Sequence, residues 1–117
     1  MGLIIGHAPT RRFEAVVDSG SPSCLFHADI AKAHGLKVET GVEGPLGGVV
    51  GGAVGKVYYH KVKLTFGSHI IPITAGFSPL LSVAAILGRH GFFEHFKIVF
   101  DPSSTPPGLQ IERIYRA

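Results

Sequence analysis

The chain has 117 residues, a length typical of a single domain, and we take 1–117 as one domain. Charged residues make up 16% and hydrophobic residues 45%, a balance that excludes intrinsic disorder, while 16 glycines and 8 prolines exclude a helical bundle or coiled coil. The net charge is +3 and the basic residues are scattered, so we expect no nucleic-acid partner.

Cys24 is the only cysteine, so the chain can form neither an internal disulfide nor a cysteine-based metal site. We interpret it as a buried small residue rather than a nucleophile. The seven histidines lack the close spacing of a metal helix or strand, and we expect no metal and no other cofactor. The first residues do not resemble a signal peptide, so a cytoplasmic location is favoured while the compartment stays open.

The first predicted strand is 13–17, an apolar run closed by a cluster of turn-forming residues. A second short strand is expected at 23–26. Residues 28–34 favour a short helix, and Gly35 stands where a left-handed residue ends such a helix. Residues 36–42 then return to an extended pattern.

The segment 41–55 holds seven glycines and is predicted to be a mobile hairpin or loop. The alternating segment 57–66 and the following 69–77 predict a β-hairpin that turns at Gly67-Ser68. The stretch 64–88 has no charged residue and is long enough to span a bilayer. Its glycines, prolines and alternation favour buried sheet elements instead, so we expect no membrane association.

The apolar run 83–87 ends at Gly88, and the phenylalanines of 89–96 have helical spacing. Late strands are predicted at 97–100 and 109–114, separated by a proline-rich turn. The chain is therefore predicted to be all-β and barrel-like, with six to eight short strands and two short helices.

Two motifs point to a function. Asp18-Ser19-Gly20-Ser21 places a carboxylate on a tight turn directly after an apolar strand, and Ala85-Ile86-Leu87-Gly88-Arg89 ends a later strand. Two carboxylates close enough to share one proton can act as a general base and a general acid. Neither Asp29 nor Asp101 lies in a comparable turn, so one chain offers a single carboxylate of this kind.

In this order and spacing the motifs resemble the retropepsin-like, or retroviral-type, aspartic protease family, from about Phe13 to Ile114. The residues 18–21 match the catalytic turn, 47–53 the flap and 86–89 the hydrophobic-hydrophobic-glycine element. The resemblance implies a closed β-barrel with a flap hairpin and one or two short helices. It also implies an endopeptidase whose active site is shared by a homodimer, with one aspartate from each chain.

The resemblance further implies roles for single residues. Asp18 is the catalytic carboxylate, Ser19 hydrogen-bonds across the dimer axis, and Gly20 lets the backbone approach closely. The hydroxyl of Ser21 is expected to donate to the outer oxygen of Asp18. A peptide or protein substrate binds as an added strand beneath the flap. The residues expected to contact it are Ser21, Gly47, Gly48, Val49, Val50, Gly51, Gly52 and Ile86.

Two positions depart from the family. In many retroviral members an acidic residue after the turn pairs with the arginine of the second motif, but here Arg89 lacks that partner, and His90 stands where Asn or Asp is more usual. The segments 3–5 and 109–111 could interleave in a dimer. The alternative interpretation is a non-catalytic dimerisation or peptide-binding module of the same fold. For Asp18 alone, the alternative is a turn residue that caps a loop.

Overall fold

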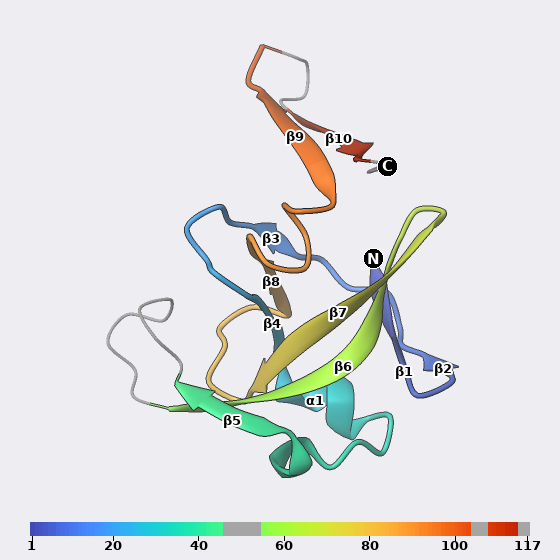
Figure 1. Ribbon diagram of the computed structural model, residues 1–117, viewed down its shortest axis with the longest axis vertical. Coiled ribbons are helices and arrows are strands. Elements are labelled where there is room, and N and C mark those ends of the chain that lie inside the picture. Colours follow the sequence, from blue (N-terminus) through green and yellow to red (C-terminus); the bar gives the residue numbers. More distant parts are fainter. Residues whose placement is uncertain (46–54, 104–107, 115–117) are drawn as a thin grey trace.

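The computed structural model describes residues 1–45, 55–103 and 108–114, and they are mostly β, as predicted (Figure 1). Eight strands form one sheet, and the last two form a separate hairpin. The elements in chain order are β1 (Gly2–Ile5), β2 (Ala8–Pro9), β3 (Val16–Val17), β4 (Cys24–His27), α1 (Ala28–Lys32), a 3₁₀ turn η1 (Val38–Thr40), β5 (Val42–Pro45), β6 (Lys56–Phe66), β7 (His69–Ser78), β8 (Ala85–Leu87), β9 (Phe96–Asp101) and β10 (Gly108–Arg113).

The long hairpin β6–β7 forms the middle of the sheet and confirms the predicted alternation. Its strands pair antiparallel from Tyr58 opposite Phe77 to Phe66 opposite His69. The chain reverses at Gly67, whose φ of 56° lies in the left-handed region that glycine adopts at no steric cost. The shorter strands β1 and β5 pair with β6, and β4 pairs with β7.

The large sheet is open rather than the closed barrel that was predicted. Its strand order is β2-β1-β6-β7-β4-β8-β3, with β5 added to the free part of β6. Within the described ranges β2 and β3 end the order and do not pair with each other. Each of these end strands has only two residues, so each offers few backbone groups for pairing with a further strand.

Aromatic rings fill the core between the sheet and the segments that cover it. Phe26 and Phe77 have ring centroids 5.9 Å apart, and Phe92 lies 4.9 Å from Phe96. Phe26, Phe77 and Phe92 are fully buried. The helix α1 closes one end by burying the small side chains of Ala28 and Ala31, and Gly35 follows it with a φ of 72°, as predicted for the residue that ends the helix.

Three local predictions differ from the structure. Only Val16–Val17 of the segment 13–17 is a strand, and 36–42 contains the 3₁₀ turn η1. The segment 89–95 consists of turns with one isolated bridge at His90 instead of a helix, and Phe96 begins β9. Gly91 explains the last difference, because its φ of 102° cannot continue a right-handed helix.

The first strand belongs to the large sheet, whereas the last two strands form a separate hairpin. β1 pairs with β2 through Ile4 and Ile5 and with β6 through Gly2 to Ile4, so this segment pairs on both sides within the chain. The hairpin β9–β10 stands away from the large sheet (Figure 1). In the part of the chain that the structure describes, no helix has the length and apolar character needed to cross a bilayer.

Candidate active site

Asp18 comes directly after β3 and opens a tight turn. Its backbone N–H donates to the carbonyl oxygen of Leu87 at 2.9 Å, and its own carbonyl accepts from the N–H of Ser21 at 3.1 Å. Its carboxylate Oδ1 accepts from the N–H of Gly20 at 2.8 Å. Asp18 is half-buried while Ser19 and Gly20 are exposed. The turn therefore holds a carboxylate at the surface in a fixed orientation.

The strand β8 lies between β3 and β4, the two strands that flank this turn. Val16 and Val17 pair in parallel with Ile86 and Leu87. On its other side β8 pairs antiparallel with β4, through Leu25 opposite Ile86. The two motifs that the sequence singled out are thus hydrogen-bonded neighbours, although they are far apart along the chain.

Gly88 and Arg89 contact the backbone of the Asp18 turn. A Cβ on Gly88 would stand 2.5 Å from the carbonyl oxygen of Ser21 and closer still to that of Ser23, so no larger residue fits. The backbone N–H of Arg89 donates to Ser21 O at 2.9 Å, and its guanidinium Nη1 donates to Ser19 O at 3.0 Å. Arg89 thus binds the backbone of the turn itself.

The hydrogen bond of the Ser21 hydroxyl differs from the predicted one. Its hydroxyl donates to the carbonyl oxygen of Ser23 at 2.7 Å. A hydroxyl has one proton to donate, so the predicted bond from Ser21 to Asp18 is wrong. The Ser21 side chain is also fully buried. In the described chain it therefore stabilises the underside of the turn.

Ile86 belongs to a small apolar cluster beside the main core. It is 8% exposed and packs with the other members of this cluster. The other members are Leu25, Val57 and Leu81, with Tyr59 packed against them. The sequence did not identify these four as site residues, because they come from three separate segments whose apolar character fits any core position.

The predicted flap residues Gly47, Gly48, Val49, Val50, Gly51 and Gly52 lie outside the described residues. The strands that lead into and out of this segment are described. β5 and β6 pair antiparallel from Val42 opposite Tyr59 to Pro45 opposite Lys56. Val57 and Tyr59 of the apolar cluster lie on this same stretch of β6.

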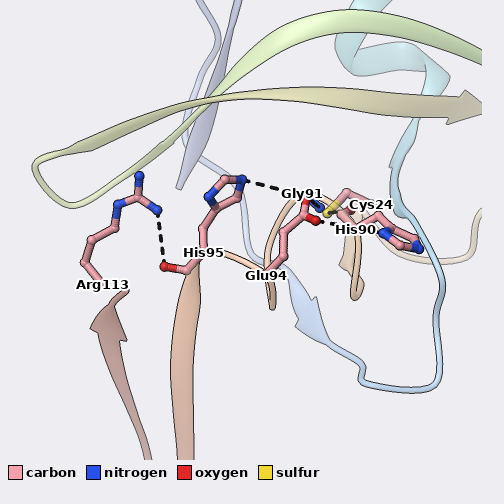
Figure 2. Close-up of polar contacts among 6 residues, drawn as sticks. All are labelled: Cys24, His90, Gly91, Glu94, His95 and Arg113. Atoms are coloured by element: carbon pink, nitrogen blue, oxygen red, sulfur yellow. Dashed lines mark hydrogen bonds and ion pairs between the residues drawn. The ribbon is translucent and has the colours of Figure 1, made fainter. Parts of the chain in front are cut away.

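Cys24 is the first residue of β4 and is fully buried, as predicted. Its thiol donates to the carbonyl oxygen of His90 at 3.4 Å (Figure 2). Burial raises the pKa of Cys24 to about 11, because removal from water disfavours the thiolate. The thiol is therefore neutral and contributes packing and one weak hydrogen bond.

Glu94 holds the turn that follows Gly88. Its Oε1 accepts from the N–H of Gly91 at 2.8 Å and lies 3.7 Å from His95 Nε2, and its Oε2 lies 3.9 Å from His90 Nδ1 (Figure 2). Arg113 adds a bond from Nη1 to His95 O at 3.2 Å. The sequence signal for Glu94 was its place three residues after Gly91, the spacing at which Glu caps a backbone N–H.

The other aspartates are engaged elsewhere. Asp29 stands on α1, 80% exposed, with a carboxylate oxygen 3.7 Å from His27 Nδ1. Asp101 accepts from the backbone N–H and the hydroxyl of Ser103 at 3.0 and 2.6 Å. Over the described ranges, no three His, Cys, Asp or Glu side chains gather in a way that could hold a metal ion.

Comparison of the chain with protein-family models, with curated proteins and with solved structures found no match.

Proposed function

We propose that this chain is one subunit of a homodimeric aspartic endopeptidase, with Asp18 of each copy as the catalytic carboxylates. The observation that carries the proposal is the position of β8 between β3 and β4. It joins the Asp18 turn to the Ile86–Arg89 motif through the bond from Asp18 N to Leu87 O and the bond from Arg89 to Ser19. Both motifs were identified separately in the sequence, and their direct contact supports one common site.

The chemistry requires two such turns related by a two-fold axis. Two carboxylates brought within a few ångströms cannot both ionise, so they share one proton. The ionised one takes a proton from water as the water oxygen attacks the scissile carbonyl carbon, and the protonated one donates to the carbonyl oxygen. The C–N bond then breaks and the leaving amine takes up a proton. A symmetric pair is completed only when a second copy supplies its Asp18.

The terminal hairpin supports association with a second copy. Paired residues of a hairpin share a face, so Ile98 with Ile111 and Phe100 with Leu109 form one apolar face. The first pair packs against the core, whereas Phe100 and Leu109 are 58% and 42% exposed. An isolated two-stranded hairpin is only marginally stable in water. A second copy would cover this outer part and stabilise it.

The substrate is expected to bind as an extended peptide between the Asp18 turn and the segment 47–52, which acts as the flap. Ile86 would then lie near the bound peptide, and adding a strand orients the scissile carbonyl. The flap of the retropepsin-like family belongs to this proposal.

Cleavage of a diverse peptide mixture between about pH 4 and pH 7 tests the proposal, because carboxylate dyads act on the acid side of neutrality. We expect cleavage by the unmodified protein and none by Asp18→Asn, which keeps the shape of the side chain but cannot share a proton. Asp29→Asn is the matched control and should cut normally, since Asp29 stands on α1.

Cleavage that survives in Asp18→Asn would refute the aspartic mechanism. A dimer that cuts nothing in either form would instead favour the alternative, a non-catalytic peptide-binding module. Sedimentation of the same samples separates this outcome from a failure to dimerise.

A further inference from the structure

A groove of about 530 Å³ lies between the segment 10–13 and the helix α1. Its walls and floor include Arg11, Arg12, Phe13, Ile30, Ala33 and His34. No residue of the Asp18 turn lines it. The groove is therefore separate from the candidate active site.

The floor of the groove is apolar and firmly supported. Phe13 and Ile30 are half-buried and pack against the main core. The Phe13 ring meets Phe26 edge to face with centroids 5.8 Å apart. His34 ties the end of the groove together, because Nε2 lies 2.9 Å from Pro9 O and Nδ1 lies 3.3 Å from Ile30 O. Such a floor is formed before any ligand arrives.

The rim of the groove is mainly positive. Arg11 and Arg12 are exposed, and within the described ranges their guanidinium groups make no ion pair or hydrogen bond. Asp29 stands on the opposite rim, and its carboxylate already faces His27 at 3.7 Å. The groove is therefore lined by two arginines without an ion pair and by one carboxylate that has a basic neighbour.

We propose that this groove binds a peptide segment of a partner protein in which an acidic residue adjoins a large apolar one. The carboxylate would be held by Arg11 and Arg12, whose planar groups match carboxylate geometry. The apolar side chain would cover Phe13, Ile30 and Ala33. The apolar floor and the carboxylate of Asp29 disfavour a nucleic-acid backbone, which needs a continuous row of cations.

The proposal goes beyond the proposed proteolysis and can be tested without it. The probe is a fluorescein-labelled peptide of alternating Glu and Phe residues flanked by glycines, and its control carries Gln at each Glu position. The protein carries Asp18→Asn, so that cleavage cannot consume either peptide. Binding is measured by fluorescence anisotropy at low and at moderate salt.

We expect the Glu peptide to bind at least about tenfold more tightly than the Gln peptide, with a difference that shrinks in salt. The double variant Arg11→Gln/Arg12→Gln should abolish this difference, and Ala33→Asp should weaken binding of the Glu peptide because it adds a carboxylate to the groove. The control Lys61→Gln/Lys63→Gln removes the same charge from exposed positions on β6 and should change binding by less than about twofold.

Equal binding of the two peptides, or no binding of either, would overturn the proposal. The same holds if Lys61→Gln/Lys63→Gln weakens binding as much as the arginine variant, because binding would then follow net charge alone. A single-stranded oligonucleotide that displaces the peptide at lower concentration would show that the groove is a nucleic-acid site instead. All four variants change exposed or half-buried residues, so folding is checked by circular dichroism in each.

Discussion

At the scale of single residues, the Asp18 turn is defined by what each position allows. Gly20 gives its N–H to Asp18, and a Cβ at Gly20 would stand 3.1 Å from the same carboxylate oxygen. Ser21 and Gly88 fill the space below the turn so tightly that neither tolerates added volume. The orientation of the carboxylate therefore depends on small residues around it.

Gly20→Ala should lower peptide cleavage by about tenfold or more, because the new methyl group displaces the Asp18 carboxylate, and about 1.4 kcal/mol of lost transition-state stabilisation has that effect. Gly20 is exposed, so the thermal midpoint should change little. Initial rates and melting curves check this against Ser68→Ala, an exposed turn position on the β6–β7 hairpin. Unchanged turnover would refute the geometry assigned to the turn.

Cys24 should resist thiol reagents while the protein is folded, because its pKa of about 11 and its burial leave little accessible thiolate. We expect slow labelling by N-ethylmaleimide near neutral pH and rapid labelling in denaturant. A folded pKa above the ordinary value of 9.0 means that the unfolded thiol ionises first. The Cys24 contribution to stability is thus complete below pH 9 and falls as pH rises toward 11.

A comparison of the wild type with Cys24→Ala isolates that alkaline loss, since the variant lacks the ionising group. Urea unfolding at several pH values between 8 and 11 measures it. An equal pH slope in both proteins would contradict the assignment.

At the scale of elements, the sequence predicted those whose signal is local. The alternation of 57–66 fixed β6, and the small apolar residues before Gly35 fixed α1. The short strands β1 and β2 were not predicted, because two to four residues carry no measurable period. The segment 89–96 was predicted as a helix from its phenylalanines, but Gly91 and the cap from Glu94 determine its turns.

In the candidate site, too, the sequence predicted only the features with a local signal. Asp18 and the Ile86–Arg89 motif are visible in the sequence because their residue types are distinctive. Their contact depends on β8 lying between β3 and β4, which no local pattern encodes. The bonds of Ser21 and Arg89 depend in turn on that contact, and this is why the hydroxyl partner of Ser21 was predicted wrongly.

Gly88→Ala should destabilise the protein by about 3 kcal/mol, because its Cβ would overlap two backbone carbonyls that cannot move without breaking the Asp18 turn. Urea unfolding measures the loss. Ser68→Ala, at an exposed turn position of the β6–β7 hairpin, is the control. A loss at Gly88→Ala no larger than experimental error would contradict the packing described for the turn.

At the scale of the whole molecule, the proposed function predicts that association and catalysis rise together. Phe100→Ser/Leu109→Ser removes the exposed apolar surface of the terminal hairpin and should weaken the dimer by about tenfold or more. Specific activity should fall with it and recover at high protein concentration. Sedimentation equilibrium and cleavage rates at several concentrations check this; a variant that remains dimeric at the lowest concentration would assign association to another surface.

The pH profile of cleavage should be bell-shaped with its optimum on the acid side, because one carboxylate of the pair must be ionised and the other protonated. Initial rates with a single peptide substrate across the acid and neutral range measure it. A rate that still rises above about pH 8 would contradict a shared proton.

Because β8 lies between β3 and β4, the Asp18 turn can be completed only late in the synthesis of the chain. β3 and β4 leave the ribosome long before β8, so the Asp18 turn lacks the bonds from Leu87 and Arg89 until about three quarters of the chain has emerged. Such long-range contacts also make folding slow relative to chains held by local contacts. A nascent chain therefore carries Asp18 without these bonds, and truncation before Arg89 leaves the Asp18 turn without the two bonds that Arg89 donates.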